Sequence, residues 1–569
     1  MIRDILPSLR NLLLYVREHP VLALQTTVTD GLPAICRHIG YAVIVFCVAT
    51  VVGVVLHLAL VVHWDVREGG LVYWAAFLPL MLLSFSLIAK KALDPLLRRF
   101  GPGQADTHGS ARFATPAEVR PLREAGRGLL IGTDTRTGSW LRYDGPAHLL
   151  TIAPTRTGKG VGTIIPNLLT ADRSVICIDP KGENARITGR ARARFGPVRV
   201  LDPFGITGQP GTAFNPLAGL KAEDVDVAEE AATLAEALVF DPPGAVGEAH
   251  WNEEAKALIT GLILHIVADA ELGERHLGTL RAWLTLAPDD FEELLDRMQA
   301  STAASGLVAR AANRHRGKAD REAAGVLSSA QRHTHFLDSP RMTAVLGRSG
   351  FRFADLKTET ATVFLVLPPD RLETYARWLR LMVTQSLLEM ARSPAKPAEP
   401  VLYLLDEFAA LGYLAPVERA MGLMAGYGVQ LWPILQDVHQ LRATYAKRAG
   451  SFFSNAAVLQ VFGVNDHETA QLVSNLLGQQ TVVFHTLSNT TGQLLSKVDP
   501  TTSESEQRTG RPLMTPDEVR NLQADSQLLF LAGQRPVYAG KLRYYSDRRF
   551  EGLFDWRSTP VIHPPARGA

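Results

Sequence analysis

Cysteine is scarce in this sequence, which contains only Cys36, Cys47 and Cys177 among its 569 residues. Their positions show neither the spacing of a metal site nor a disulfide framework, which is typical of a reducing, mostly cytosolic location. The net charge at pH 7 is only +2, so any contact with nucleic acid must depend on local basic patches. No internal repeat is present. A length above roughly 250–300 residues predicts several domains.

Two long apolar runs near the N-terminus predict membrane spans. Residues 39–62 hold Tyr41, Thr50 and His57 as their only polar side chains, and residues 71–89 carry no charge. Each run approaches the roughly 20 apolar residues needed to cross a bilayer core. The short connector predicts a hairpin, and basic residues on either side of the hairpin place both ends in the cytoplasm. Because a charged segment precedes the first run, we expect no cleaved signal peptide.

A motif typical of phosphate binding follows the apolar, strand-like residues 148–152. A turn-prone stretch holds Gly158, Lys159 and Gly160, and a helix-capable run comes next. Strand, glycine-containing loop, lysine and helix bind phosphates through backbone N–H groups, and Lys159 is expected to reach the β- and γ-phosphates. The match is incomplete, because Ala153 replaces the first glycine and Gly160 stands where a magnesium-binding Ser or Thr is expected. The predicted nucleotide-binding residues are Pro154, Thr155, Arg156, Thr157, Gly158, Lys159, Gly160 and Val161.

The second half of a nucleotide site lies far downstream, where VLYLLDEF (residues 401–408) predicts a buried strand ending in two acids. In P-loop ATPases the first such acid, here Asp406, holds magnesium, usually through water. Glu407 is placed to polarise the attacking water as general base. Gln436 ends a neighbouring apolar run and is interpreted as a γ-phosphate sensor, with turn capping as the alternative. Together the motifs predict a site for ATP and Mg²⁺, with Lys159, Glu407 and Gln436 as catalytic residues.

Strand-like runs alternate with helical stretches before and after the middle of the chain. This alternation predicts an α/β fold with a parallel, doubly wound sheet. Asp179, Lys181 and Asp202 follow strand-like runs, and we expect them near the nucleotide rim or as turn caps.

The alternation disappears between residues 221 and 350, where helix spacing predicts an inserted all-helical domain.

Its basic run, residues 310–321, is interpreted as a solvated helix face, with DNA or protein contact as the alternative. His333 and His335 lack a matching pair of ligands and are interpreted as solvated helix residues rather than a zinc site. The Ser- and Thr-rich residues 486–510 are interpreted as a mobile loop or a disordered segment. Within the predicted helical domain, one stretch has apolar residues that recur at helix spacing and so predict a helix: Ala255, Leu258, Ile259, Leu262 and Ile266.

These patterns predict the following division of the chain. The expected parts are a cytoplasmic N-terminal segment (1–38), a transmembrane hairpin (39–89), a juxtamembrane link (90–146), the first half of a nucleotide-binding domain (147–220), the all-helical inserted domain (221–350), the second half of the nucleotide-binding domain (351–550) and a tail (551–569).

Several motifs resemble those of TraG-type coupling proteins, the membrane-anchored ATPases of conjugative and type IV secretion systems. In family order these are APTRTGKGVGTIIPNLL, DPKGEN, FNPL, HWNEEAKALITGLILHI, VFLVLPPDRL, LLDEFAALG, GYGVQLWPILQDVHQL and GQRPVYAGKLRYY. The family loop often carries GKG, so Gly160 resembles its relatives. Some relatives carry an arginine where this chain has Ala425, so no trans-acting arginine is assigned.

The resemblance implies a RecA-like P-loop ATPase domain with an inserted all-helical domain and an N-terminal transmembrane hairpin. It implies homo-hexamers at the bacterial inner membrane, multi-pass and with the bulk of the chain cytoplasmic. It further implies ATP-driven recruitment and pumping of single-stranded DNA with its attached relaxase, or of effector proteins, into a type IV secretion channel.

Two other functions stay open at the level of sequence. An FtsK-like DNA translocase shares the anchor and the RecA-like core, but the inserted helical domain argues against it. A non-hydrolysing docking scaffold for secretion substrates is favoured by Gly160, because magnesium then loses one direct ligand.

Overall fold

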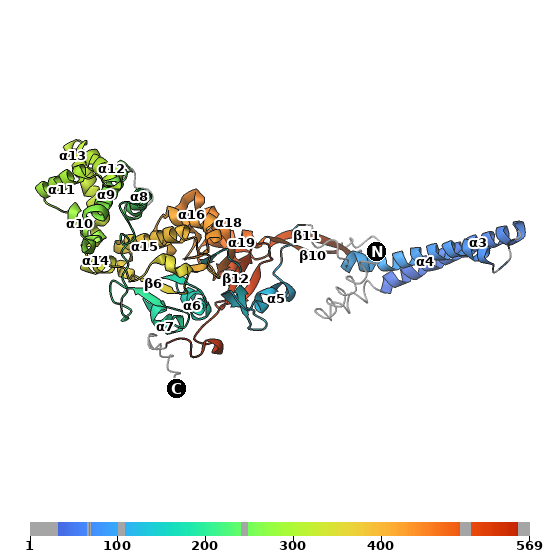
Figure 1. Cartoon of the computed structure of the whole chain (residues 1–569). Helices are drawn as coiled ribbons and strands as arrows, with labels where there is room; N and C mark the ends of the chain where they lie inside the picture. The colour runs from blue at the N-terminus through green and yellow to red at the C-terminus, as the bar shows by residue number, and fades with distance from the viewer. Residues whose placement is uncertain are drawn as a thin grey trace, which may run out of the picture. The chain divides into compact units, whose positions relative to one another are not determined.

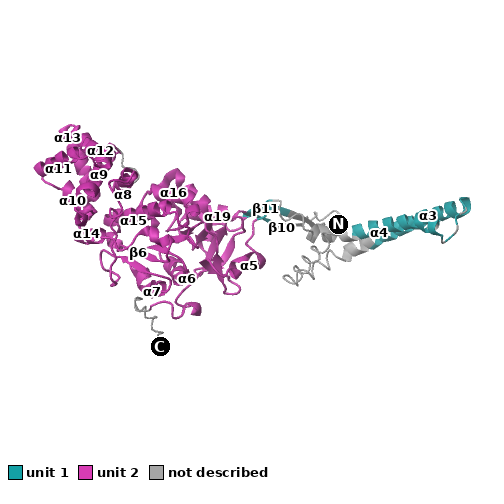
Figure 2. Cartoon of the chain, viewed as in Figure 1, with its two compact units in different colours: residues 1–110, 479–511 teal, residues 111–478, 512–569 magenta. Residues whose placement is uncertain are grey.

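The computed structural model describes residues 32–64, 66, 68, 70–100, 108–240, 249–489 and 502–555. The chain forms two units, shown in Figure 2. The first unit comprises Met1–Ser110 and Gln479–Arg511, and the second comprises Ala111–Gly478 and Pro512–Ala569.

Two long apolar helices belong to the first unit. Helix α3 (Leu32–His57) continues as a π-helical turn, η2 (Leu58–His63), and α4 (Leu71–Phe100) follows. The two helices pack against each other at Gly53, where an added Cβ would make ordinary van der Waals contacts with Phe77 and Leu80, at 3.7 and 3.9 Å. The segments Ile39–His63 and Trp74–Lys91 are long and apolar enough to cross a membrane, and their outward side chains are largely exposed. Both spans predicted from the sequence are therefore helical.

A two-stranded ribbon also belongs to the first unit. Strand β10 (Gln479–Asn489) pairs with β11 (Thr502–Pro512), and Figure 1 shows the two side by side. The prediction of a mobile loop over residues 486–510 is therefore wrong where the structure describes it, and residues 490–501 lie outside the described residues. Composition could not reveal this ribbon, because pairing between the two strands satisfies their backbone N–H and C=O groups whatever the side chains.

The second unit is built on an eleven-stranded sheet of order β2-β1-β13-β12-β9-β3-β8-β7-β4-β6-β5. The seven strands from β9 to β5 are parallel, as predicted. The four strands at the other edge are antiparallel, because the connections β1–β2 and β12–β13 are too short for a crossover. The strands are β1 (Leu129–Thr133), β2 (Trp140–Tyr143), β3 (His148–Ile152), β4 (Val175–Asp179), β5 (Val198–Leu201), β6 (Thr362–Val366), β7 (Val401–Leu405), β8 (Val429–Leu435), β9 (Ala456–Val461), β12 (Ser526–Leu531) and β13 (Val537–Gly540).

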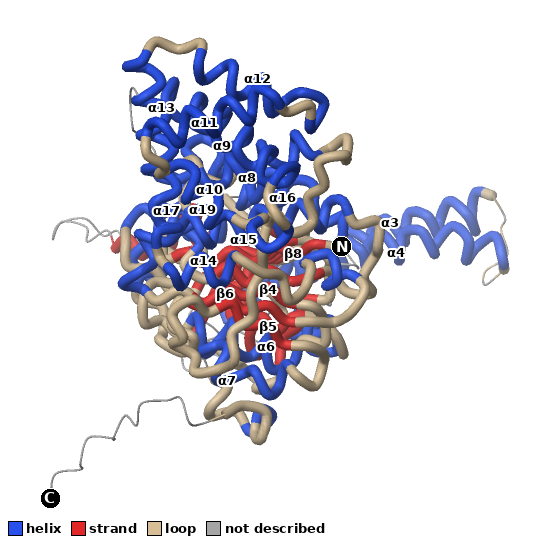
Figure 3. Tube along the Cα trace, turned by 60° about the vertical axis from the view of Figure 1, so that its left-hand side comes forward, coloured by secondary structure: helices blue, strands red, loops and turns tan. Residues whose placement is uncertain are grey.

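Helices cover both faces of this sheet. Figures 1 and 3 show α6 (Ile165–Thr170) and α7 (Glu183–Arg192) on one face, with α15 (Leu372–Arg392) and α16 (Ala415–Leu423) on the other. The central strands are apolar and buried on both faces, as parallel strands in such a layer must be. The remaining flanking helices are α5 (Pro116–Glu124), α17 (Val438–Tyr445), α18 (Ala449–Asn455), α19 (His467–Leu477) and α20 (Pro516–Arg520).

A helical subdomain lies between β5 and β6 in the chain. Its central helix α9 buries all five apolar residues whose spacing predicted it, each at most 3% exposed. Helix α9 packs against α8, α12 and α13. The helices are α8 (Val227–Leu238), α9 (Ala249–Asp269), α10 (Leu277–Leu284), α11 (Pro288–Ala300), α12 (Ala303–Arg316), α13 (Asp320–Thr334) and α14 (Pro340–Leu346).

The basic run of this subdomain is neutralised by its own acids. Glu254 lies 2.6 Å from Arg314 and 2.7 Å from Lys318, and Arg316 lies 2.8 Å from Asp296. These pairs favour the solvated helix face over a basic patch left open for DNA.

His333 is not a solvated residue, contrary to the sequence interpretation. It is fully buried, with Nε2 2.9 Å from Asn252 Oδ1 and Nδ1 3.1 Å from Arg377 Nη2. Helix spacing could not reveal this, because the covering partner, α15, comes from a distant part of the chain. His335 is exposed beside Asp338. Among the described residues no three His, Cys, Asp or Glu side chains gather as metal ligands.

Candidate nucleotide site

The phosphate loop begins where β3 ends. Strand β3 is fully buried, and the loop leads into a π-helical turn, η3 (Gly160–Ile164), and then α6. Gly158 (φ 96°) and Arg156 (φ 66°) adopt left-handed backbone, which lets the loop turn tightly. Thr157 closes the turn, since its N–H and its hydroxyl both donate to the Pro154 carbonyl, at 3.2 and 2.7 Å. Strand, loop and helix thus occur in the predicted order.

A buried polar network holds the helix behind the loop against the sheet. Thr151 and Thr163 both donate to Gln460 Oε1, at 2.8 and 3.1 Å, and Trp432 Nε1 donates to Thr151 at 2.8 Å. Asn167 pairs with both backbone groups of Leu130. A satisfied network of this kind fixes one geometry, because any shift leaves a buried polar group unpaired.

Lys159 brings the two predicted motifs together. Its Nζ lies 2.8 Å from Asp406 Oδ1 and 2.5 Å from Glu407 Oε1. Burial alone lowers the pKa of Lys159, but the two carboxylates outweigh burial and raise it above its ordinary value. Burial raises the pKa of Asp406 despite the ammonium beside it. The two acids therefore neutralise the charge of the loop lysine.

Glu407 and Gln436 lie at the carboxyl ends of adjacent parallel strands, β7 and β8. Glu407 is held in left-handed backbone (φ 50°, ψ 43°), and its N–H donates to Asp406 Oδ1 at 3.0 Å. Gln436 Nε2 donates to Glu407 Oε2 at 3.2 Å, and Gln436 Oε1 accepts from the Thr155 hydroxyl at 3.2 Å. The glutamine thus bridges the phosphate loop and the second acid.

Asp179, the last residue of β4, and Asp202, just after β5, are turn caps, one of the two roles expected for them. Asp179 accepts from the N–H of Ala185 at 2.9 Å, and burial raises its pKa to about 6. Asp202 accepts from the N–H and the hydroxyl of Thr207 at 2.8 and 2.7 Å. Lys181 is exposed.

Magnesium has one buried carboxylate, that of Asp406, available beside the loop. Gly160 offers no hydroxyl, and Thr157 already donates to Pro154. This donor set fits Mg²⁺ bound chiefly by phosphate oxygens and water, as the ion prefers.

One residue of the site was missed by sequence reasoning. Lys541, just after β13, donates from Nζ to the Thr157 carbonyl at 3.2 Å. No local pattern marks it, although it lies within a motif of the family resemblance.

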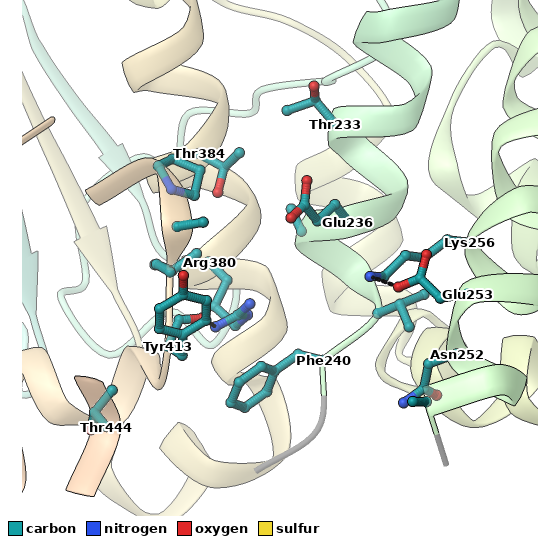
Figure 4. A pocket seen from close by; sticks show the side chains of 16 residues that line it. Thr233, Glu236, Phe240, Asn252, Glu253, Lys256, Arg380, Thr384, Tyr413 and Thr444 are labelled. Carbon is teal, nitrogen blue, oxygen red and sulfur yellow. Dashed lines mark hydrogen bonds and ion pairs between the residues drawn. The ribbon is translucent and has the colours of Figure 1, made fainter. Parts of the chain in front are cut away.

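A second cavity, of about 440 Å³, lies where the helical subdomain meets the sheet domain (Figure 4). Arg380 of α15 is buried in its wall and donates from Nη1 to the Leu411 and Tyr413 carbonyls at 2.6 and 2.8 Å. Figure 4 shows its guanidinium directed toward Phe240, whose ring centroid lies 3.9 Å away. Burial lowers the Arg380 pKa to about 10. Arg380 thus fixes the segment that follows Glu407.

This fold and this arrangement of loop, acids and glutamine define a RecA-like P-loop protein. Residues 120–559 match the family described as type IV secretory system conjugative DNA transfer, and the chain belongs to that family. Conjugal transfer protein TraG of Escherichia coli is 30% identical over 495 residues, covering 78% of this chain and 77% of TraG. Protein VirD4 of Agrobacterium fabrum is 30% identical over 490 residues, covering 80% of this chain and 69% of VirD4.

Solved structures of the plasmid coupling protein TrwB share the fold. TrwB with the non-hydrolysable ATP analogue ADPNP has a TM-score of 0.58 at 19% identity, covering 76% of this chain and 93% of TrwB. TrwB with ADP and Mg²⁺ has a TM-score of 0.57 at 19% identity, covering 76% and 94%. The predicted fold class and the family resemblance are confirmed.

Proposed function

We propose that this protein is an ATP-hydrolysing coupling protein that recruits single-stranded DNA with its bound relaxase, or effector proteins, and pumps them into a type IV secretion channel. The observation that carries this proposal is the position of Lys159 between Asp406 and Glu407, with Gln436 joining Glu407 to the loop. An exposed structural ion pair would not need a glutamine bridge to a phosphate loop.

The geometry supports a simple order of events at the site. When ATP enters the loop, backbone N–H groups of residues 155, 156 and 158–161 surround its phosphates, and Lys159 exchanges the carboxylates for phosphate oxygens. Asp406 is then free to hold the hydrated magnesium ion, which neutralises phosphate charge. Glu407 is free to accept a proton from the attacking water, and Gln436 keeps it oriented toward the γ-phosphate. After release of phosphate and ADP, Lys159 returns to the acids.

Other parts of the chain and its relatives support the rest of the proposal. The helices α3 and α4 are compatible with an inner-membrane anchor, multi-pass and with the motor on the cytoplasmic side. Relatives are named for conjugal transfer, and TrwB is a plasmid coupling protein. We infer homo-hexamers and secretion-channel partners from this family membership.

ATP hydrolysis by the detergent-solubilised full chain tests the proposal, measured with and without single-stranded DNA and beside Glu407→Gln. DNA-stimulated turnover that disappears in the variant supports a nucleic-acid motor with Glu407 as base. Stimulation by a secreted protein alone supports effector export. Stimulation by duplex DNA without any secretion apparatus supports the FtsK-like alternative.

A docking scaffold is the second candidate function, because Gly160 gives magnesium no hydroxyl and Lys159 already pairs with both acids. ATP binding without turnover under any of these conditions supports the scaffold and overturns the motor.

A further inference from the structure

A second lysine approaches the phosphate loop from behind. Lys541 follows β13, and its Nζ donates to the Thr157 carbonyl at 3.2 Å while lying 4.9 Å from the centroid of the Phe462 ring. Its own N–H donates to the Asp525 carbonyl at 2.7 Å. Both ends of this residue are therefore fixed, and the ammonium cannot leave the loop without losing two contacts.

The segment carrying Lys541 packs closely against the start of the loop helix. Leu542 and Tyr544 are buried, and the Tyr544 N–H donates to the Val161 carbonyl at 3.4 Å. A Cβ at Gly162 would lie 3.0 Å from the Leu542 carbonyl oxygen and 3.2 Å from the Phe462 ring, tighter than most Cβ contacts, so the two segments pack closely at this glycine. The chain after β13 thus contacts the phosphate loop that also carries Lys159, and these contacts hold the loop in place.

The distribution of charge around the loop indicates a role for the Lys541 ammonium. Two carboxylates already neutralise Lys159, so Lys541 supplies additional positive charge next to the loop. The charged groups facing Lys541 are Asp525 and Arg543, and these two pair with each other. Burial chiefly, with some repulsion from Arg543, lowers the Lys541 pKa to about 8, against the opposing effect of Asp525. The Lys541 ammonium is half-buried, and the nearby carboxylate of Asp525 is paired with Arg543. An anion that binds close to the ammonium therefore stabilises its charged form.

We propose that Lys541 is a positioning residue of the nucleotide site, which holds the phosphate loop through the Thr157 carbonyl and whose positive charge supports binding of nucleoside triphosphate phosphates. This inference rests on the proposed binding of ATP. Lys159 contacts the phosphates, whereas Lys541 acts through the loop backbone and through its charge.

Equilibrium binding of a fluorescent ATP analogue with Mg²⁺, measured from about pH 6.5 to pH 9.5 on the solubilised full chain, tests the inference. The variants are Lys541→Met and Lys541→Arg, with Lys396→Met, an exposed lysine outside the site, as the control. At pH 7 we expect Lys541→Met to bind about tenfold more weakly than the unsubstituted protein. The unsubstituted protein should lose affinity as pH rises through 8, where free Lys541 gives up its proton.

The variants should differ in the shape of their pH profiles, which a purely structural role would not change. Lys541→Arg keeps its charge above pH 8 and should retain affinity without the alkaline decline. Lys541→Met should be flat through pH 8 and weak throughout. An alkaline decline that persists in Lys541→Arg, or equal affinity of Lys541→Met and the unsubstituted protein, overturns the inference and leaves the proposed function standing. Failure of the unsubstituted protein to bind any nucleotide overturns both.

Discussion

The Lys159 ammonium lies 2.5 Å from a carboxylate oxygen of Glu407, although 248 residues separate them in the chain. The parallel arrangement explains this closeness, because β3 and β7 flank β8 and end at the same edge of the sheet. The pairing joins the loop lysine directly to the proposed base, and Asp406 shares the same ammonium at 2.8 Å.

Replacing Lys159 tests whether this residue is required for hydrolysis. We expect Lys159→Ala to lower ATP turnover by at least about 100-fold, because the variant loses the loop ammonium that would stabilise charge developing on the phosphates. The measurement is steady-state phosphate release, with carbonate extraction of membranes as the control for insertion. Insertion should be unchanged, since α3 and α4 belong to the other unit. Full turnover by the purified variant contradicts the role given to Lys159.

Replacing Gln436 tests the bridge between loop and base. Gln436→Ala leaves Glu407 without its orienting partner, so we expect roughly 100-fold lower kcat with little change in KM. Thr155→Val removes only the hydroxyl that donates to Gln436 Oε1 and should lower kcat less than Gln436→Ala does. The measurement is a full rate profile against ATP concentration for both variants. A rise in KM at constant kcat contradicts the assignment and places Gln436 in ground-state binding.

Much of the site could be predicted because each half is contiguous in sequence. The loop around Lys159 and the pair Asp406–Glu407 each follow a buried strand, and parallel strands bring their carboxyl ends together. Lys541 could not be predicted in this way. It follows the antiparallel β12–β13 hairpin, and nothing in its own sequence says that the chain then packs against the loop.

The fold shows the same division between local and distant information. Periodicity found α9 and its buried face, because an apolar stripe depends only on neighbouring residues. It failed for His333, whose burial depends on Asn252 and Arg377 from two other helices. It also failed for the β10–β11 ribbon, where each strand is specified by its partner rather than by a core face.

Replacing Arg380 tests the link between α15 and the segment after the acids. We expect Arg380→Met to lower the free energy of unfolding by about 2 kcal/mol, because the Leu411 and Tyr413 carbonyls lose their donor. Denaturant unfolding followed by fluorescence measures this change. Lys396→Met, on the exposed surface, should change stability by less than about 0.5 kcal/mol. Equal effects of the two substitutions contradict the role of Arg380.

The buried carboxyl of Asp179 makes stability depend on pH. Burial raises its pKa from 3.8 to about 6 in the folded chain, so the folded protein binds this proton more tightly than the unfolded one. Stability from this group is complete below about pH 3.8 and is lost as pH rises toward 6. Asp179→Asn removes the charge but keeps an oxygen that can accept from the Ala185 N–H. We therefore expect the variant to melt about 1–2 °C higher than the unsubstituted protein at pH 8, the shift expected for one or two kcal/mol in a unit of this size.

The difference in Tm between the two proteins should shrink as pH falls to 5, because the native carboxyl is then mostly neutral as well. Thermal unfolding across this range, followed by circular dichroism, measures it. Thr188→Val, which removes a hydroxyl bond to the Asn184 carbonyl on the same helix without changing charge, is the matched control and should show no such pH dependence. A difference that is constant with pH means that Asp179 is ionised in the folded chain at pH 5, and that its hydrogen bonds to the turn, rather than burial, set its pKa.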